Sequence, residues 1–377
     1  MNVPPQGRPK TGPSIAEGGV ADEPPSPPSQ GQRREFAEHG SAPPEPAGCA
    51  KPAVGRGLGE RPYILCGDIG GTKTLLGLAH NGNFVVERRY ANADFHDFAS
   101  LLATFFADTQ TNPSTIDDGC LAVAGPIADD GRTAELTNLP WRIASESLAS
   151  GFGLPVLRLA NDFAAAAMGA VTASRAQTLT LQAGEPLGTA PCLVVGAGTG
   201  LGMAIVLPQD GQWRIVAGEG GHVAFAPADE QQMALWRFLH ARHGRVTWER
   251  VVSGPGLTAI HEFLAGVELP PEEIAARAAL NDPDAPDSAE RRSLDLFLAA
   301  YGAFAGDMAL ACLARGGVFL AGGIAAKLLP ILQHSGFLAA FKAKAEHAAI
   351  AARMPVHVAT DPALGLHGAL QLAALRS

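Results

Sequence analysis

Residues 67–74 read Gly-Asp-Ile-Gly-Gly-Thr-Lys-Thr, and this stretch decides how the rest of the chain is interpreted. It nearly spells the phosphate-binding pattern GxxxxGK[ST], but Thr72 stands where that pattern requires Gly. A P-loop also leads into a helix, whereas residues 75–79 are apolar and are soon followed by Asn81-Gly82, a strong hairpin signal. We therefore predict a glycine-rich turn between two antiparallel strands.

A second glycine-rich turn follows an apolar run at 192–195 and reads Gly-Ala-Gly-Thr-Gly-Leu-Gly over residues 196–202. We call residues 67–72 the first glycine turn and residues 196–202 the second glycine turn. Without Cβ atoms, glycines let backbone N–H groups converge on an anion, and Thr72 and Thr199 each add a hydroxyl donor. The alternative is that the glycines only satisfy positive φ angles, but two such turns favour a polyphosphate site. Asp68 could hold a phosphate-bound Mg²⁺, directly or through water.

Apolar runs typical of strands and of helices alternate along the chain, which predicts an α/β fold. The halves of the chain look related, because each opens with a strand, a glycine turn and a second strand. Residues 281–292 are polar and rich in Pro and Asp, so we expect a solvated loop there. The expected strands are residues 63–66, 75–79, 84–88, 119–123, 155–160, 192–195, 203–207 and 317–320, and the expected helices are residues 95–108, 163–171, 231–240, 294–314 and 364–375.

The composition separates the first 60 residues from the rest of the chain. They hold 12 of the 29 prolines, and Phe36 is their only aromatic residue. Such a segment cannot bury enough apolar surface to offset its ordering entropy, so we predict a disordered arm at 1–60.

The charge balance and the cysteines exclude several classes of protein. The chain has 28 basic and 37 acidic residues and no Lys/Arg run, which argues against nucleic-acid binding. The start of the sequence lacks an apolar signal segment and no run of 18 apolar residues occurs, so we expect a soluble, cytoplasmic protein without a membrane anchor. The five cysteines are scattered without a CxxC pair, so no disulfide framework or zinc site is expected.

Several polar side chains follow apolar runs and could together bind a hydroxylated ligand. Each also has an ordinary explanation: Asn161-Asp162 could cap a helix, Glu219 and His222 could form a polar turn, and Glu249 could be a solvated surface acid. Asn138 lies in a loop that could simply be a Pro/Trp packing corner. Taken together, they supply donors and acceptors that suit a ring of hydroxyl groups.

Seven motifs in one order make the chain from about residue 62 to the C-terminus resemble bacterial glucokinase, a hexokinase-like family of the actin-like ATPase superfamily. They begin at the first glycine turn and continue through Thr137-Asn138, Asn161-Asp162-Phe163, the second glycine turn, Gly218-Glu219-Gly220-Gly221-His222, Glu249-Arg250-Val251-Val252-Ser253-Gly254-Pro255-Gly256 and Gly316 to Ile324.

The resemblance implies two RNase H-like α/β lobes around a central cleft, with MgATP and glucose as substrates. The implied small lobe is 61–172 with a C-terminal helix at 363–377 packing back on it, and the large lobe is 173–362. Asp162 would be the catalytic base that takes the proton of the 6-hydroxyl. By matching motif, the residues that contact the sugar would be Asn138, Asn161, Glu219, His222 and Glu249. The phosphates would be contacted by Gly67, Asp68, Ile69, Gly70, Gly71, Thr72, Thr199 and Gly200. The adenosine would be contacted by Gly322 and Gly323.

Three other functions stay open on sequence alone. The closest rival is a kinase for another hexose or an amino sugar, because pocket residues do not fix the epimer. A sugar-sensing regulator would carry an N-terminal helix-turn-helix, for which residues 1–60 are too rich in proline, and a general ATPase would need no sugar. The oligomeric state, with a homodimer as one option, and allosteric control are not given by the sequence.

Overall fold

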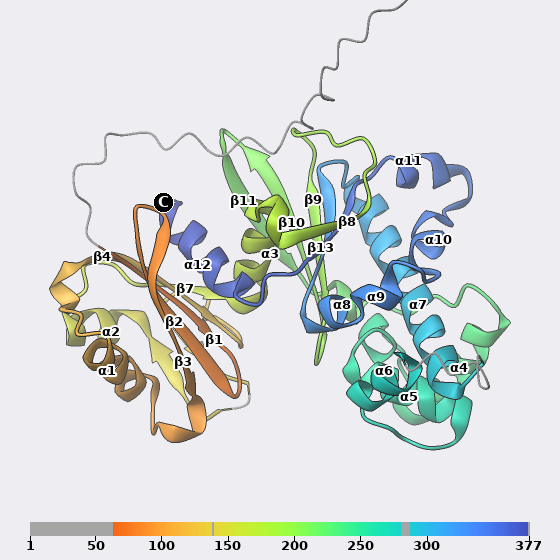
Figure 1. Ribbon diagram of the computed structural model, residues 1–377, viewed down its shortest axis with the longest axis horizontal. Helices are drawn as coiled ribbons and strands as arrows, with labels where there is room; N and C mark the ends of the chain where they lie inside the picture. Colours follow the sequence, from red (N-terminus) through yellow and green to blue (C-terminus); the bar gives the residue numbers. More distant parts are fainter. Residues whose placement is uncertain (1–62, 138, 280–286, 376–377) are drawn as a thin grey trace, which may run out of the picture. The chain divides into compact units, whose positions relative to one another are not determined.

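The computed structural model describes residues 63–137, 139–279 and 287–375 (Figure 1). Within these residues the chain forms two large mixed sheets flanked by helices, so the predicted α/β class is confirmed. The predicted arm at 1–60 and Asn138 lie outside the described residues, as does part of the loop expected at 281–292.

The first sheet has the strand order β3-β2-β1-β4-β7. Strands β1, β2 and β3 form an antiparallel meander, while β4 and β7 add in parallel beside β1. Asn81 and Gly82 have φ angles of 51° and 78°, which confirms the predicted hairpin between β2 and β3. The strands are β1 (Tyr63–Ile69), β2 (Lys73–His80), β3 (Asn83–Ala91), β4 (Ile116–Val123) and β7 (Arg158–Asn161).

The second sheet repeats this pattern with the order β11-β10-β9-β12-β13-β8. Strands β9, β10 and β11 are antiparallel, β12 and β13 add in parallel beside β9, and β8 closes the far edge in the antiparallel sense. The predicted relation between the two halves is therefore confirmed. The strands are β8 (Thr178–Gln182), β9 (Cys192–Ala197), β10 (Leu201–Gln209), β11 (Gln212–Gly218), β12 (Gly317–Ala321) and β13 (Val356–Ala359), and a separate two-stranded sheet holds β5 (Thr133–Glu135) and β6 (Arg142–Ala144).

All five expected helices are present, with shifted ends. The first begins at Phe98 because the Asp97 side chain accepts the Ser100 N–H at 2.8 Å as an N-terminal cap. The helices are α1 (Phe98–Asp108), α2 (Ser145–Phe152), α3 (Asp162–Thr172), α4 (Glu230–His243), α5 (Gly254–Ala265), α6 (Pro271–Ala279), α7 (Ala289–Cys312), α8 (Gly323–Lys327), α9 (Leu329–Leu332), α10 (Phe337–Lys342), α11 (Ala348–Ala352) and α12 (Leu364–Ala374).

The prediction of a loop at 281–292 is wrong for the last four of these residues, which are helical. Helix α7 begins at Ala289, because the Ser288 hydroxyl caps it by accepting the Arg291 N–H at 3.2 Å. Arg291 then pairs with Asp295 one turn later at 3.3 Å, so the polar residues form the solvent-facing first turns of the helix.

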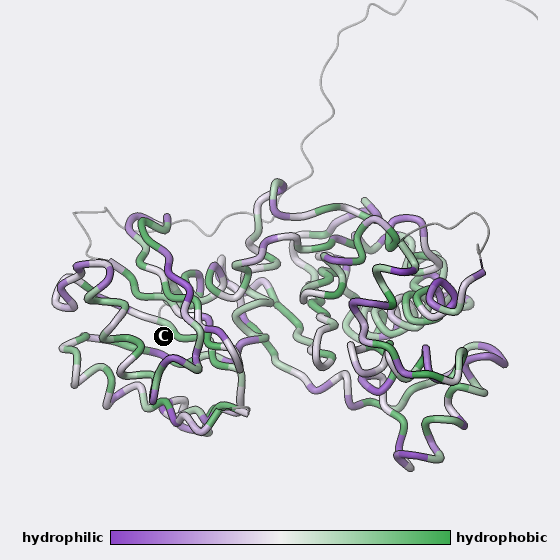
Figure 2. The backbone as a smooth tube through the Cα atoms, turned by 60° about the horizontal axis from the view of Figure 1, so that its bottom comes forward, coloured by the Kyte–Doolittle hydropathy of each residue, from purple (hydrophilic) through white to green (hydrophobic). Residues whose placement is uncertain are grey.

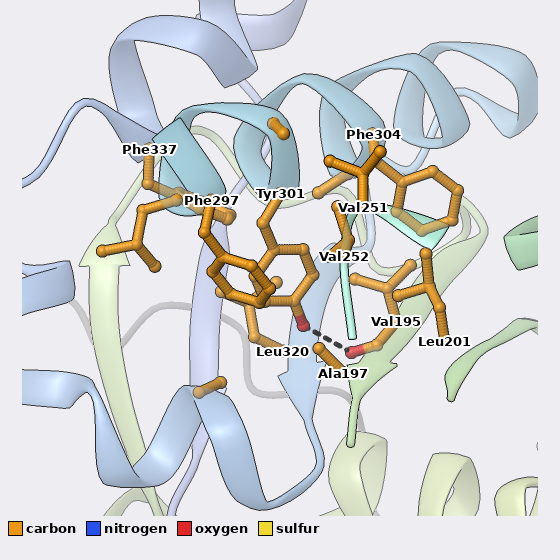
Figure 3. Packing of buried hydrophobic residues seen from close by; sticks show 14 of the residues in the cluster. Val195, Ala197, Leu201, Val251, Val252, Phe297, Tyr301, Phe304, Leu320 and Phe337 are labelled. Carbon is orange, nitrogen blue, oxygen red and sulfur yellow. Dashed lines mark hydrogen bonds between the residues drawn. The ribbon is translucent and has the colours of Figure 1, made fainter. Parts of the chain in front are cut away.

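Helix α7 is long and apolar enough to cross a membrane, with a mean hydropathy of 1.4, yet 67% of that window is buried inside the structure. Phe297, Tyr301 and Phe304 on this helix are fully buried against the second sheet (Figure 3). The Tyr301 hydroxyl donates to the Val195 carbonyl of β9 at 3.3 Å. These contacts identify α7 as the central core helix of the second half.

Each large sheet has its own hydrophobic core, and hydrophobic stretches occur in both halves of the chain (Figure 2). The first core lies between its sheet and α1, whereas the second is built around α7. Helices α3 and α12 pack on each other, α12 also covers β1 and β4, and α3 also contacts β10 and β11 of the second sheet. The pair α3/α12 therefore links the two sheets.

Candidate active site

The first glycine turn is a tight connection between β1 and β2. The Gly70 N–H donates to the Lys73 carbonyl at 3.0 Å, and β2 continues as a strand, so the predicted hairpin is confirmed and a P-loop is excluded. Gly67, Asp68 and Ile69 belong to β1, whereas Gly70, Gly71 and Thr72 form the turn itself.

Asn92, which sequence reasoning missed, stabilises this turn through three hydrogen bonds. Its Nδ2 donates to the Gly70 carbonyl at 2.8 Å, its backbone N–H donates to the Thr72 carbonyl at 2.9 Å, and its Oδ1 accepts from the Thr74 hydroxyl at 2.8 Å. Asn92 and Thr74 are almost completely buried, with 1% and 0% exposure. A lone Asn after a charged strand carries no sequence signal for this role, because the register of β2 and β3 brings it to the turn.

Asp68 is a buried acid at the end of β1. Burial and, to a smaller extent, the negative charge of Asp162 raise its pKa to about 6, against the opposing effect of Arg89. Helix α12 closes against this carboxylate, since a Cβ atom on Gly365 would lie only 2.6 Å from Asp68 Oδ2. Glycine at position 365 is therefore needed for the helix to approach the acid.

Asn161 and Asp162 stand at the junction of β7 and α3. Asn161 is the N-cap, because its Oδ1 accepts the N–H groups of Phe163 and Ala164 at 3.0 and 3.2 Å. Asp162 Oδ1 also accepts the Phe163 N–H, at 2.7 Å. Burial raises the pKa of Asp162, and hydrogen bonds from the helix N-terminus and Asn161 only partly offset this.

Asp68 and Asp162 lie at the same edge of the first sheet. Strands β1 and β7 flank β4 and run parallel to it, so their carboxyl ends meet, and the Asp162 charge is felt at Asp68. The carboxyl ends of parallel strands are where α/β folds place their functional groups. Asn161 thus fills the capping role expected for the pair, and Asp162 shares only the Phe163 N–H with it.

Glu249 is bound to the second glycine turn and is not a free surface acid. Its Oε2 accepts the Leu201 N–H at 2.9 Å, and a Cβ atom on Gly200 would lie 2.6 Å from the same oxygen. The carboxylate is held there because Val251 and Val252, which follow it, are fully buried beside Leu201 (Figure 3). Exposed Thr199 lies at the tip of the turn.

The segment with Glu219 and His222 packs against the start of β10. Gly220 and Gly221 make this possible, since Cβ atoms there would lie 2.3 Å from Met203 Sδ and from the Leu201 carbonyl oxygen. The following residue, Val223, accepts the N–H of Trp248 at 3.0 Å. Glu219, His222 and Glu249 are therefore brought to the same end of the second sheet, with Glu219 and His222 exposed.

Gly322 and Gly323 lie beside the second glycine turn. Ala321 is the register partner of Gly196, and Gly322 has a φ of 83°, with no room for a Cβ atom, which would lie 2.6 Å from the Ala197 carbonyl oxygen. Both glycines are exposed at the start of α8. The structure thus joins two motifs that lie more than a hundred residues apart in sequence.

Asn138 lies outside the described residues, but its neighbour Thr137 is placed. The Thr137 N–H donates to the Ala124 carbonyl at 3.3 Å, and the Ala124 N–H donates to the Ile69 carbonyl at 2.9 Å. The loop that carries residue 138 therefore begins beside the end of β1.

Two sheets that share a five-strand order, each with a glycine-rich hairpin and linked by α3 and α12, define the two-lobed actin-like ATPase fold. The glucokinase family model matches residues 65–376. The chain belongs to the glucokinase family.

A relative of known name and two solved structures match the chain over nearly their whole length. The glucokinase of Trichormus variabilis is 38% identical over 340 residues, which span 82% of this chain and 98% of that protein. A crystal structure of a glucokinase from an Antarctic psychrotroph has a TM-score of 0.74 at 29% identity, over 82% of this chain and 98% of that one. A ROK-family glucokinase from Streptomyces griseus, in complex with glucose and AMPPNP, shares the fold, with a TM-score of 0.54 at 20% identity over 82% of this chain and 99% of its own.

Proposed function

We propose that the protein transfers the terminal phosphoryl group of ATP to the 6-hydroxyl of D-glucose, giving glucose 6-phosphate and ADP. Membership of the glucokinase family supports this activity. The observation that carries the mechanism is the pair of partly buried acids, Asp68 and Asp162, which lie at one edge of the first sheet and both have a raised pKa. Asp68 is suited to bind a cation, and Asp162 is suited to accept a proton.

Asp162 is the proposed base. Its carboxylate would orient the 6-hydroxyl of the sugar and accept its proton during transfer, a role that contributes about 10²–10⁴-fold to rate. The raised pKa of Asp162 makes it a better proton acceptor than an ordinary aspartate, while the hydrogen bonds at the N-terminus of α3 keep the ionised form accessible.

The phosphates of ATP would lie against the two glycine turns. In the first turn the contacts would come from Gly67, Asp68, Ile69, Gly70, Gly71 and Thr72, and in the second from Thr199 and Gly200. Gly322 and Gly323, exposed beside the second turn, are suited to a flat adenosine group because they present no side chain. Alignment and charge stabilisation by backbone donors would supply most of the remaining catalysis.

Asp68 fits a Mg²⁺ site, with contact through water or through a bound phosphate. The fit rests on its environment: a buried carboxylate with a raised pKa regains its charged form when a cation binds beside it. When bound, Mg²⁺ neutralises the charge that develops on the phosphate oxygens. The chain's own part is to place the Asp68 carboxylate at the end of β1, where the absence of a Cβ atom on Gly365 leaves room for its oxygens.

The sugar would be read by Asn138, Asn161, Glu219, His222 and Glu249. The bond from the Leu201 N–H fixes one oxygen of Glu249, so the other oxygen could accept from a hydroxyl group. We also propose lobe boundaries at 61–172 with 363–377, and at 173–362, with closure around the substrates excluding water. The enzyme would act on small molecules in the cytoplasm, as a monomer or homodimer, without a nucleic-acid or membrane partner.

Replacement of the base tests the mechanism. Asp162→Ala should abolish phosphoryl transfer while glucose binding stays measurable by calorimetry, because the sugar contacts on the second sheet remain. Near-normal turnover of this variant would remove Asp162 from the mechanism. Rates with glucose, mannose, fructose and glucosamine test the substrate, and a clear preference for a sugar other than glucose would overturn the assignment to glucose.

A further inference from the structure

The ring of Phe163 lies over two glycines of the second glycine turn. A Cβ atom on Gly196 would lie 2.5 Å from Phe163 Cε2, and one on Gly202 would lie 2.4 Å from Phe163 Cδ2. Gly196 and Gly202 face each other as register partners on β9 and β10. Together they form a flat slot, and the aromatic ring covers the two side-chain-free positions of the sheet.

This slot gives two glycines of the turn a purpose other than phosphate binding. Gly196 and Gly202 accommodate a side chain from α3, whereas the phosphate contacts proposed at the tip of the turn, Thr199 and Gly200, lie outside this slot. Phe163 is also the residue directly after Asp162, and its N–H donates to Asp162 Oδ1 at 2.7 Å. The proposed base and the second glycine turn are therefore joined through one residue.

We propose that Phe163 is a positioning residue: its ring, seated on Gly196 and Gly202, sets where the Asp162 carboxylate stands relative to the second glycine turn. This inference rests on the proposed function, in which Asp162 takes the proton of the hydroxyl that attacks a phosphate held at that turn. Asp162 belongs to the edge of the first sheet and the turn belongs to the second sheet, so the packing of Phe163 between them sets the spacing of the reacting groups.

The fold gives a reason to separate positioning from general stability. Helix α3 stays anchored without the Phe163 ring, because Ala165, Ala167 and Met168 are fully buried further along it. Phe319 offers a matched control: it is a half-buried ring on β12 in the same hydrophobic cluster. Its centroid lies 5.2 Å from that of the His357 ring in a tilted arrangement, and it also lies near Gly317. It is not adjacent to either acid in the chain.

The test measures kcat, the KM values for ATP and glucose, and the melting temperature for Phe163→Ala, Phe163→Leu and Phe319→Ala. Phe163→Ala should lower kcat about 10- to 100-fold with both KM values within about twofold, because a small displacement of a reacting group is that costly. Phe163→Leu should recover part of kcat. Phe319→Ala should lower the melting temperature by about as much as Phe163→Ala does, but its kcat should stay within about twofold of the wild type.

A double-variant cycle tests the slot itself. Gly202→Ala should lower kcat, since its methyl group displaces the ring, and Phe163→Ala/Gly202→Ala should be no slower than Phe163→Ala alone. The inference is overturned if Phe163→Ala turns over within about twofold of an active wild type, or if the two substitutions multiply. A wild type without glucose-dependent ADP formation would instead refute the proposed function, so the two failures are distinguishable.

Discussion

Replacing Asp68 by Asn should stabilise the metal-free protein at neutral pH while removing its activity. The Asp68 carboxyl group is buried at the end of β1, in the field of Asp162 and against Gly365 of α12. Its ionised form is therefore disfavoured in the folded chain. Asn has nearly the same shape without the charge, so Asp68→Asn removes the electrostatic cost and leaves the packing unchanged.

The magnitude follows from the pKa of about 6 in the folded chain against 3.8 for an ordinary aspartate. This difference corresponds to about 3 kcal/mol. The native state binds the Asp68 proton more tightly than the unfolded chain does. The free energy of unfolding of the wild type therefore falls as the pH rises from about 3.8 to about 6, and the whole loss is reached above about pH 7. The gain in Asp68→Asn should be about 0.5 kcal/mol at pH 4 and about 3 kcal/mol at pH 7.

The assay is urea unfolding in EDTA without nucleotide, at a series of pH values from 4 to 8. Asp97→Asn is the control, because the Ser100 N–H lowers the pKa of exposed Asp97 and its substitution should change stability in the opposite direction. Loss of stability in Asp68→Asn at pH 7, or a gain that does not depend on pH, would refute the reasoning. Activity should be lost in either event, because the proposed cation contact is gone.

Three further predictions concern other parts of the molecule. Asn92→Ala should destabilise the protein by about 2–4 kcal/mol and raise the KM for ATP, because the Gly70 carbonyl and the Thr74 hydroxyl lose their hydrogen-bond partner. Urea unfolding and steady-state kinetics measure the two effects, and an unchanged KM would show that the first glycine turn does not need Asn92. Glu249→Gln should raise the KM for glucose and keep the fold, since an amide oxygen can still accept the Leu201 N–H; an unchanged KM would remove Glu249 from the sugar site. Deletion of residues 1–60 should leave kcat and both KM values nearly intact, since every proposed functional group follows residue 60; a large loss would show that the arm contributes to the enzyme.

Local signals made the two glycine turns and their hairpins predictable. The pair Asn81-Gly82 favours a hairpin turn by itself, because Asn and Gly tolerate the positive φ angles that such a turn requires. Asn161-Asp162 was also predictable as a helix start, since capping depends only on the next three residues. The relation between the two halves was predictable because the same local unit occurs twice, whereas the strand order of each sheet was not predicted.

Contacts between distant segments were not predictable. Asn92 reaches the first glycine turn through the pairing of β2 and β3, and Gly365 meets Asp68 through the packing of α12 on β1; neither leaves a local pattern. The glycines of the second turn combine both kinds of signal. The phosphate contacts expected at Thr199 and Gly200 stay a prediction, whereas the packing of Phe163, which no local pattern shows, accounts for Gly196 and Gly202.

The central claim is that ATP is consumed only to phosphorylate a sugar. The most direct measurement is ADP release by the purified protein with Mg²⁺ and ATP, in the presence and absence of glucose, with glucose 6-phosphate assayed in parallel. We predict that ADP forms only with glucose and in equal amount to glucose 6-phosphate. ADP release at the same rate without sugar, or none with glucose, would contradict the account.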